Sequence, residues 1–333
     1  MEKILITGGC GFIGSNFIRH IINKYPQYKI INLDKLTYAG NKDNLKDIEK
    51  NPRYKFVKGD ICNARIVKKL IKEVNMVINF ASETHVDRSL LSADNFLKTN
   101  LLGTHVLLET LRYKKINLYL QISTDEVYGS REVGFFKEDS PLNPSNPYSV
   151  SKASADMLVL TYQRIYKIPA IIARSSNNFG PYQYPEKIIP LFITNLLENK
   201  KVPLYGEGAN IRDWLYVLDN VSALDTIMHQ GKIGEVYNIG AGNLLSNLQL
   251  TRILLKIMGK TEEFIEKVPD RPAHDFRYAL DFSKITALGW RPRYSFEDAL
   301  KETIDWYKKN EHWWKPLKAR CQFPRVSLET LEM

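Results

Sequence analysis

Residues 3–14 run Lys-Ile-Leu-Ile-Thr-Gly-Gly-Cys-Gly-Phe-Ile-Gly, an apolar segment followed by a glycine-rich turn with the spacing G-x-x-G-x-x-G. Glycines at Gly8, Gly11 and Gly14 allow a tight turn, bring backbone amides close to a pyrophosphate, and let a helix pack closely on its strand. Asp34 ends the next apolar segment 20 residues after Gly14. A carboxylate there can bind the ribose hydroxyls of an adenosine and would repel a 2′-phosphate. The stretch therefore predicts a dinucleotide-binding β-α-β unit that prefers NAD to NADP.

Outward from this unit, short apolar segments alternate with longer amphipathic ones through the first half of the chain. This alternation is typical of strands and helices that build a parallel sheet. We therefore expect an α/β fold, a Rossmann-type doubly wound parallel sheet with a smaller C-terminal lobe. The predicted strands cover residues 3–7, 29–33, 55–57, 76–80, 118–122 and 170–173, and the predicted helices cover residues 12–24, 64–73, 100–112 and 149–166.

The regular alternation ends after Arg174, where several prolines and the segment 205–209 interrupt it. We expect the NAD-binding domain to occupy residues 1–175 and a second lobe to occupy mainly residues 176–333. Residues 214–218 and 235–239 resemble short strands, so the chain is expected to return to the first domain near residues 214–240. The basic, tryptophan-containing segment 301–325 is interpreted as a helix that buries its aromatic side chains, in preference to a nucleic-acid patch.

Composition limits the classes of partner and compartment. The chain has 333 residues, 44% of them hydrophobic and 25% charged, which excludes wholesale disorder. A formal net charge of +10 favours anionic partners such as nucleotides, phosphates, nucleic acid or a membrane surface. The cysteines, Cys10, Cys62 and Cys321, are scattered without ligand spacing, so we expect a reducing compartment and no metal. Because no apolar run is long enough for a signal peptide or a membrane span, a cytoplasmic protein is expected.

Two further segments extend the predicted cofactor site. Asp60 and Ile61 follow the third predicted strand, where they can flank an adenine. Phe80, Ala81 and Ser82 close the fourth predicted strand at the sheet edge where ligands bind in such folds. The small side chains at this point permit a close approach of the cofactor.

The segment Tyr148-Ser-Val-Ser-Lys152 places a phenol and an ammonium four residues apart, on one face of one predicted helix. The ammonium, aided by a positively charged nicotinamide, is expected to lower the pKa of the phenol from about 10. Tyr148 could then remove a proton from a substrate hydroxyl while the hydride on the same carbon passes to NAD. The spacing has little weight alone, but here it follows a cofactor turn and a strand that carries Ser123 and Thr124.

Asp125 and Glu126 come directly after Thr124 and indicate chemistry beyond hydride transfer. Once C4 of a hexose is a ketone, the proton on C5 is acidic and the hydroxyl on C6 can leave. One carboxylate as base and one carboxylic acid as proton donor would eliminate water. The structural alternative is an acidic strand end that caps the next helix. The neighbouring tyrosine and lysine favour the catalytic interpretation.

At this point the chain resembles, over essentially its whole length, the dTDP-glucose 4,6-dehydratase family of extended short-chain dehydrogenases/reductases. The likeness implies dehydration of dTDP-glucose to dTDP-4-keto-6-deoxyglucose, for deoxysugar biosynthesis of the rhamnose type, by C4 oxidation, elimination across C5 and C6, and hydride return to C6. NAD would stay tightly bound and be regenerated in each turnover. The matching stretches are residues 81–89, 123–129, 148–156, 176–183, 185–187, 211–214 and 270–275.

The resemblance also assigns residue roles. Asp125 would be the acid for the C6 hydroxyl, Glu126 the base at C5 and Tyr148 the base at C4, with Thr124 placing the C4 oxygen and Lys152 supporting Tyr148. It implies cofactor contacts by Phe12, Ile13, Asp34, Lys35, Leu36, Thr37, Asp60, Ile61, Phe80, Ala81, Ser82, Thr99, Tyr148, Lys152 and Asn178, which join Gly8, Gly11 and Gly14. It implies that the second lobe holds the sugar nucleotide through Thr84, Thr124, Asn177, Lys187, Ile188, Pro203, Leu204, Tyr205, Arg212, Asn247, Asp270, Arg271, Pro272, Ala273 and His274.

Alternative functions remain open at this point. A UDP-glucose 4,6-dehydratase would perform the same chemistry on a uracil nucleotide. A nucleotide-sugar 4-epimerase is disfavoured by Asp125 and Glu126, and a non-catalytic RNA-binding Rossmann protein is the alternative from another class. A homodimer is expected through helices 100–112 and 149–166, because relatives pair that way. No nucleic-acid or membrane partner is expected.

Overall fold

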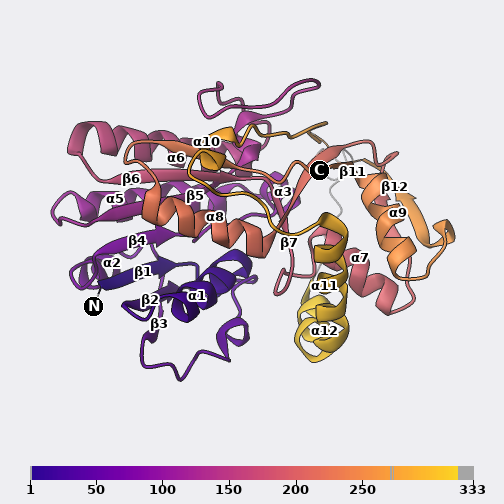
Figure 1. The fold of residues 1–333 in the computed structure, drawn as a ribbon, viewed down its shortest axis with the longest axis horizontal. Helices are drawn as coiled ribbons and strands as arrows, with labels where there is room; N and C mark the ends of the chain where they lie inside the picture. The colour runs from indigo at the N-terminus through magenta and orange to yellow at the C-terminus, as the bar shows by residue number, and fades with distance from the viewer. Residues whose placement is uncertain (1, 271, 273, 322–333) are drawn as a thin grey trace.

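The computed structural model describes residues 2–270, 272 and 274–321. Its centre is a seven-stranded sheet with the strand order β10-β6-β5-β4-β1-β2-β3 (Figure 1). Every neighbouring pair in this sheet is parallel, which confirms the predicted doubly wound α/β fold. The strands are β1 (Glu2–Thr7), β2 (Tyr28–Asp34), β3 (Tyr54–Lys58), β4 (Met76–Asn79), β5 (Leu118–Thr124), β6 (Ala170–Ser175) and β10 (Val236–Ile239).

Both faces of this sheet are buried under helices. In β1, Ile4 and Ile6 pack toward α1 (Phe12–Lys24) and α8 (Val217–Gln230), whereas Leu5 packs toward the opposite face. The alternation follows from the two-residue period of a strand, and burial on both faces explains why the strands are apolar throughout. The opposite face is covered by α2 (Ala64–Ile71), α5 (Thr104–Leu111) and α6 (Pro147–Tyr166).

Element ends depart from the sequence predictions where local caps decide them. α1 has the predicted bounds, but α6 begins at Pro147, because Asn146 and Ser149 form a reciprocal capping box around a proline in the first turn. The predicted helix 100–112 begins instead as the π-helical turn η2 (Leu97–Gly103) and continues as α5. β5 runs on to Thr124, two residues past its predicted end, so Thr124 is placed by the sheet itself.

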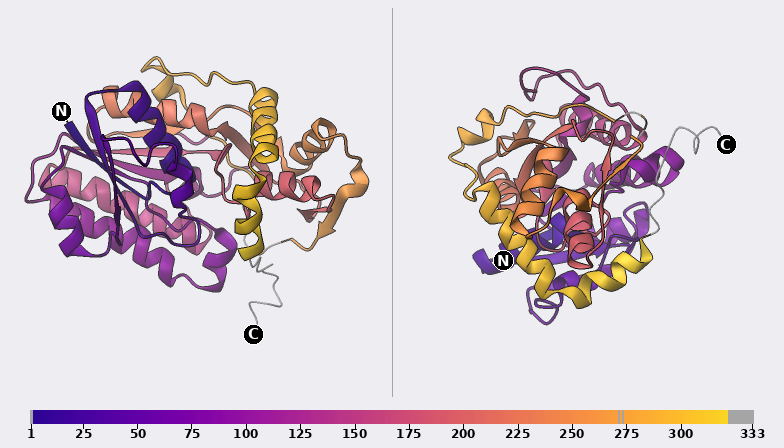
Figure 2. Two further views of the ribbon diagram at one scale, coloured as in Figure 1. Left: turned by 90° about the horizontal axis from the view of Figure 1, so that it is seen from below. Right: turned by 90° about the vertical axis from the view of Figure 1, so that its right-hand side faces the viewer.

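The smaller lobe is built on short strands beyond the carboxyl ends of the large sheet (Figures 1 and 2). One small sheet has the order β11-β9-β7 and another pairs β12 with β8. The prediction that residues 214–218 form a strand of the first domain is wrong, because this segment lies in β9 and α8 and β9 pairs in the small sheet. The strand that returns to the large sheet is β10. The elements are β7 (Asn177–Phe179), α7 (Ile188–Leu197), β8 (Val202–Tyr205), β9 (Ile211–Tyr216), β11 (Leu244–Ser246), α9 (Asn247–Ile257), η4 (Glu262–Phe264) and β12 (Ile265–Val268).

The C-terminal part folds into α11 (Phe296–Lys309) and α12 (Glu311–Arg320). Tyr307 and Trp314 are fully buried and Trp313 nearly so, which confirms the predicted docking of aromatic side chains for the part up to residue 321; residues 322–325 lie outside the described residues. Among the described residues, no helix has the length and apolar character needed to cross a bilayer. The remaining short elements are η1 (Lys42–Leu45), α3 (Val86–Leu91), α4 (Asp94–Phe96), η3 (Asp125–Tyr128) and α10 (Ser283–Thr286).

Candidate active site

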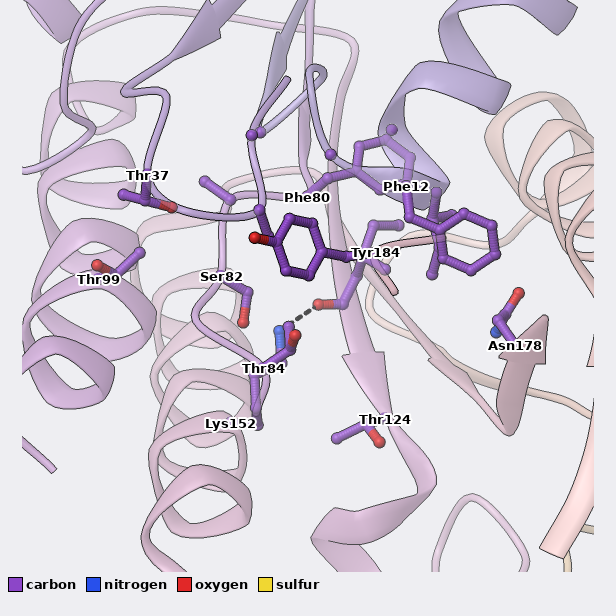
Figure 3. A pocket seen from close by; sticks show the side chains of 18 of the residues that line it. Phe12, Thr37, Phe80, Ser82, Thr84, Thr99, Thr124, Lys152, Asn178 and Tyr184 are labelled. Carbon is purple, nitrogen blue, oxygen red and sulfur yellow. Dashed lines mark hydrogen bonds between the residues drawn. The ribbon is translucent and has the colours of Figure 1, made fainter. Parts of the chain in front are cut away.

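Two adjoining cavities open at the carboxyl ends of the large sheet. The first has a volume of about 300 Å³ and the second of about 360 Å³. Both are lined by Glu126, Asn177, Glu186 and Lys187, so they meet at the end of β5. The side chains labelled in Figure 3, from Phe12 and Thr37 to Thr124 and Lys152, belong to the first cavity.

The glycine-rich turn forms one wall of the first cavity. Gly8 has φ +68°, and a Cβ atom on it would lie 2.6 Å from the Cα atom of Ala81. A Cβ atom on Gly14 would lie 2.6 Å from the carbonyl oxygen of Gly8. Both contacts are closer than side chains tolerate, so the turn needs glycine to fold against β4 and α1. The amino end of α1 thereby faces the cavity, where its backbone amides favour an anion.

Asp34 lies at the end of β2 and is fixed by the turn. Its Oδ2 accepts the backbone N–H of Cys10 at 2.8 Å, and its Oδ1 accepts that of Leu36 at 2.8 Å. Burial raises the pKa of Asp34, while these two N–H groups oppose the rise. Beside it, Lys35 Nζ lies 2.9 Å from Asp60 Oδ2.

Every predicted cofactor residue except Leu36 lines the first cavity. Leu36 instead has φ +59° and orients Asp34 through its backbone N–H, so it shapes the loop without reaching the cavity. Of the predicted substrate residues, Thr84 and Thr124 line the first cavity. The second cavity is lined by Asn177, Lys187, Ile188, Pro203, Leu204, Tyr205, Arg212, Asn247 and His274.

The remaining substrate predictions fall elsewhere. Asp270 and Pro272 line neither cavity. Asp270 Oδ1 lies 2.7 Å from Nδ1 of His274, which lines the second cavity, so Asp270 contacts a lining residue without lining the cavity itself. Arg271 and Ala273 lie outside the described residues.

The five predicted catalytic residues meet in the first cavity, although they come from three elements. Thr124 ends β5, Asp125 and Glu126 begin η3, and Tyr148 and Lys152 lie on α6. Thr124 Oγ1 donates to Asp125 Oδ1 at 3.1 Å and accepts the backbone N–H of Glu126 at 3.3 Å. One threonine hydroxyl therefore bonds the carboxyl group of Asp125 and the backbone of Glu126 at the end of the strand.

The environment of Asp125 favours the protonated acid. Its side chain is buried, and burial raises the pKa well above the usual range of an aspartic acid. The negative charge of Glu126 raises the pKa further, and the hydrogen bond from Thr124 and the charge of Arg212 oppose the rise. Among the described residues, Asp125 Oδ2 has no hydrogen-bond partner. The neutral carboxyl group can therefore hold a proton close to a ligand.

The sequence prediction of a lowered pKa for Tyr148 includes the charge of a bound nicotinamide. In the polypeptide alone the pKa of Tyr148 lies well above that of a free phenol, because burial and then the charge of Glu126 raise it, while a hydrogen bond with Thr124 lowers it. Lys152 Nζ donates to the carbonyl oxygen of Ile122 at 2.6 Å. Burial lowers the pKa of Lys152 to about 8, against the charge of Asp156. The four-residue spacing identified the pair but contained no information about burial.

Sequence reasoning missed a cluster where the two cavities meet. The buried Glu186 accepts a hydrogen bond from Tyr38 at 2.8 Å and lies 3.4 Å from Arg88 Nη2. The Arg88 guanidinium lies 4.1 Å from the centre of the Tyr38 ring. These residues come from three distant segments, so no spacing in the sequence links them. The signals in the sequence were the matching stretches 81–89 and 185–187, which contain Arg88 and Glu186 but do not link them.

Comparison with known proteins gives consistent matches over nearly the whole chain. The family model described as GDP-mannose 4,6 dehydratase matches residues 5–303. A low-salt glycan biosynthesis protein, Agl12 of Haloferax volcanii, is 49% identical over 91% of this chain and 98% of its own length. A dTDP-glucose 4,6-dehydratase of Streptomyces niveus is 47% identical over 95% of this chain and 96% of its own. A crystal structure of DesIV, a dTDP-glucose 4,6-dehydratase from Streptomyces venezuelae, has NAD and TYD bound. Its sequence is 45% identical to this one, the match covers 95% of this chain and 99% of that chain, and the TM-score is 0.93.

The buried Lys152 leads to a prediction on stability and pH. Its pKa is about 8 in the folded protein and about 10.4 when unfolded. Between these two pH values the unfolded chain keeps a proton that the folded chain has lost, so the free energy of unfolding rises with pH. Below pH 8 the buried charge of Lys152 lowers the free energy of unfolding by about 3 kcal/mol. Allowing for the lost hydrogen bond, Lys152→Met should be more stable than the wild type at pH 7 by about 1–2 kcal/mol.

Urea unfolding at pH 7 and at pH 9.5 measures this difference, which should shrink at the higher pH. Lys69→Met, which removes an exposed lysine on α2, is the matched control and should show no such dependence. The same difference in free energy of unfolding between wild type and Lys152→Met at both pH values would contradict a lowered pKa of Lys152.

Proposed function

Because the chain belongs to the nucleotide-sugar 4,6-dehydratase family that the GDP-mannose 4,6 dehydratase model describes, we propose that it dehydrates dTDP-glucose to dTDP-4-keto-6-deoxyglucose with bound NAD. The net reaction is the loss of one water molecule, since the hydride removed from C4 returns to C6. The observation that carries this proposal is the pair Asp125 and Glu126 beside Tyr148 and Lys152 in one cavity.

An elimination needs one group that gives a proton and another that takes one, in the same site and at the same pH. Burial supplies the first, because it keeps Asp125 protonated. Glu126 lies next to it and lines both cavities, so it can reach a sugar held between them. We assign Glu126 as the base that removes the C5 proton and Asp125 as the acid that protonates the leaving C6 hydroxyl. Two neighbouring carboxyl groups with different environments commonly divide acid and base work in this way.

The residues of the first cavity fit NAD. The glycine turn leaves no room for side chains where the backbone amides face the cavity, and Asp34 presents its carboxylate at the far end. Asn177 Oδ1 and Asn178 Oδ1 are buried there without a hydrogen-bond partner among the described residues, which suits a polar ligand. Bound NAD supplies the acceptor and donor for the hydride.

Tyr148 is proposed to take the proton of the C4 hydroxyl, with Thr124 as the hydrogen-bonding partner of that oxygen. Because burial raises the pKa of Tyr148, its phenolate needs positive charge close by. Lys152 lines the same cavity, and its short bond to the carbonyl of Ile122 holds the amine against β5. We therefore assign Lys152 to the support of Tyr148 and of the cofactor.

We propose that residues 176–333 mainly hold the sugar nucleotide and residues 1–175 hold NAD, with β10 as the returning strand. The second cavity supports this division, because the cationic side chains of Lys187 and Arg212 line it. Arg212 is buried, donates to the carbonyl oxygens of Ile211 and Asp275, and lies 4.3 Å from the centre of the Tyr278 ring. A guanidinium fixed in this way suits a pyrophosphate.

A homodimer through α5 and α6 is also proposed. On α6, Val150, Met157 and Ile165 are exposed and lie seven and eight residues apart, so they share one side of the helix. Leu97 and Leu102 of η2, which packs against α6, are exposed as well. An apolar area of this kind is typical of an interaction surface.

We further propose that the protein works in the cytoplasm. Cys10, Cys62 and Cys321 are all free thiols. Cys10 lies in the cofactor turn, where burial raises the pKa of its thiol to about 12. A thiol at this position suits a reducing compartment, in which it stays unmodified.

Incubation of the purified protein with dTDP-glucose, without added NAD or reductant, tests the function. A 4-keto-6-deoxy product should accumulate, because the hydride stays within the turnover. A strong preference for UDP-glucose would assign the uracil nucleotide instead, and a C4 epimer without a keto product would identify a 4-epimerase. Tight RNA binding without turnover or bound dinucleotide would favour the non-catalytic alternative.

Substitution of the carboxyl groups separates their roles. Asp125→Asn and Glu126→Gln should each lower turnover by about 10²–10⁴-fold, as expected when a general acid or base is removed. In D₂O, unreacted substrate recovered from Asp125→Asn should contain deuterium at C5, because Glu126 still exchanges that proton. Substrate recovered from Glu126→Gln should contain none. Glu132→Gln, which alters an exposed carboxylate after η3, is the control. Wild-type turnover by either site variant would remove that residue from the mechanism.

Sedimentation velocity tests the dimer. The wild type should sediment as a dimer, and Met157→Glu should shift it toward monomer, because the substitution places a charge in the middle of the apolar side of α6. Lys69→Glu on α2 serves as a control for the added charge. A monomeric wild type would overturn this arrangement without affecting the proposed chemistry.

A further inference from the structure

The C-terminal helices α11 and α12 lie between the large sheet and the smaller lobe (Figures 1 and 2). α11 packs against α7 and β9 of the smaller lobe, and α12 reaches η1, which follows β2. None of their residues lines either cavity. Two chains of hydrogen bonds nevertheless connect this helix pair with the walls of the cofactor cavity.

The first chain begins at Trp313 of α12. Its indole N–H donates to Asn44 Oδ1 at 2.9 Å, in the buried interior. Asn44 Nδ2 donates in turn to the carbonyl oxygen of Cys10 at 2.9 Å. Cys10 is part of the glycine turn, and its N–H is the group that binds Asp34. Trp313 is therefore connected, through the side-chain amide of Asn44, to Cys10, the residue whose N–H binds Asp34.

The second chain begins at Tyr307 of α11, which is fully buried. Its hydroxyl donates to the backbone carbonyl of Gln183. Gln183 Nε2 donates to the carbonyl oxygen of Asn178 at 2.8 Å. Both Gln183 and Asn178 line the cofactor cavity. The helix pair thus bonds to two separate segments that carry lining residues of one cavity.

Aromatic packing joins the two chains into one unit. The ring of Tyr182 lies 4.7 Å from that of Trp306 and 5.9 Å from that of Trp313, measured between centres. Tyr182 has φ +69°, a left-handed conformation that costs free energy in a residue other than glycine. Contact with the two tryptophans, and with Arg19 4.7 Å above its ring, compensates for this cost and fixes the segment next to Gln183.

We propose that α11 and α12 are positioning elements of the cofactor site, and that Trp313 and Tyr307 slow the release of NAD; this inference rests on the proposed function. A cavity wall that is ordered in advance lowers the entropic cost of binding. Slow release matters in this reaction because the hydride removed from C4 must return to C6. A cofactor that left between these steps would strand an oxidised sugar in the site.

Two tryptophans with similar hydrogen bonds provide a matched test. Trp313→Phe removes the bond to Asn44 and keeps an aromatic ring, whereas Trp290→Phe removes a bond of similar length, 2.8 Å, to the hydroxyl of Ser222, outside both chains. The purified holoenzyme is diluted into a trap for free NAD, and the rate of NAD release is measured together with the thermal midpoint. Trp313→Phe should release NAD about tenfold faster than the wild type, the effect of one buried hydrogen bond. Trp290→Phe should lower the midpoint similarly and release NAD at the wild-type rate.

Turnover of diluted Trp313→Phe should fall with time and return when NAD is added, which a damaged catalytic site would not do. Tyr307→Phe removes only a hydroxyl and should also release NAD faster, which gives a second variant if Trp313→Phe does not fold. Equal release rates for the Trp313 and Trp290 variants, or wild-type release by Trp313→Phe and Tyr307→Phe, would overturn the proposal. If the wild-type protein turns over substrate and the variants give either of these results, the inference is wrong and the proposed function stands. A wild-type protein that binds no NAD and has no turnover would contradict the proposed function as well.

Discussion

Burial of both faces of the parallel sheet is the constraint on which the rest of the structure depends. Because helices cover the faces, polar groups can meet a ligand only beyond the strand ends, and in a parallel sheet the carboxyl ends lie together. β1, β2, β4 and β5 therefore deliver the glycine turn, Asp34, the segment after Asn79, and Thr124 to one edge. The smaller lobe lies beyond this edge, and burial of the charged groups at the edge gives them their altered pKa values.

That burial has opposite effects on neighbouring groups, and the proposed chemistry uses the difference. It keeps the proton on Asp125 and lowers the proton affinity of Lys152. The site thus holds a neutral acid and a cation that is easily discharged, both unfavourable for stability. Such groups persist where catalysis requires them. Thr124 limits the cost, because its single hydroxyl bonds with both carboxyl-bearing residues.

The sequence was sufficient for features that local geometry decides. The glycine turn and α1 follow from residues within one short segment, and the bounds of α1 agree with the prediction. Features that depend on distant residues could not be read in this way. The raised pKa of Tyr148 reflects burial against Val86 and Phe96. Strand β9 pairs with one strand that precedes it and one that follows it in the sequence. Glu186 accepts a hydrogen bond from Tyr38, 148 positions earlier in the chain. For these, periodicity and spacing give no information, because the contact exists only after the chain has folded.

The basic C-terminal segment shows how composition and structure answer different questions. Its lysines form ion pairs at the surface, such as Lys315 with Glu311 at 2.6 Å and Lys301 with Asp298 at 3.4 Å. Much of the positive charge of this segment is therefore paired with acidic side chains exposed to solvent. Exposed pairs of this kind contribute little to stability. The aromatic residues between them point inward and bond to the segments that carry the cofactor walls. In this segment the net charge therefore describes the outer surface of the helices, whereas their connection to the site depends on neutral hydrogen-bond donors that a charge count does not include.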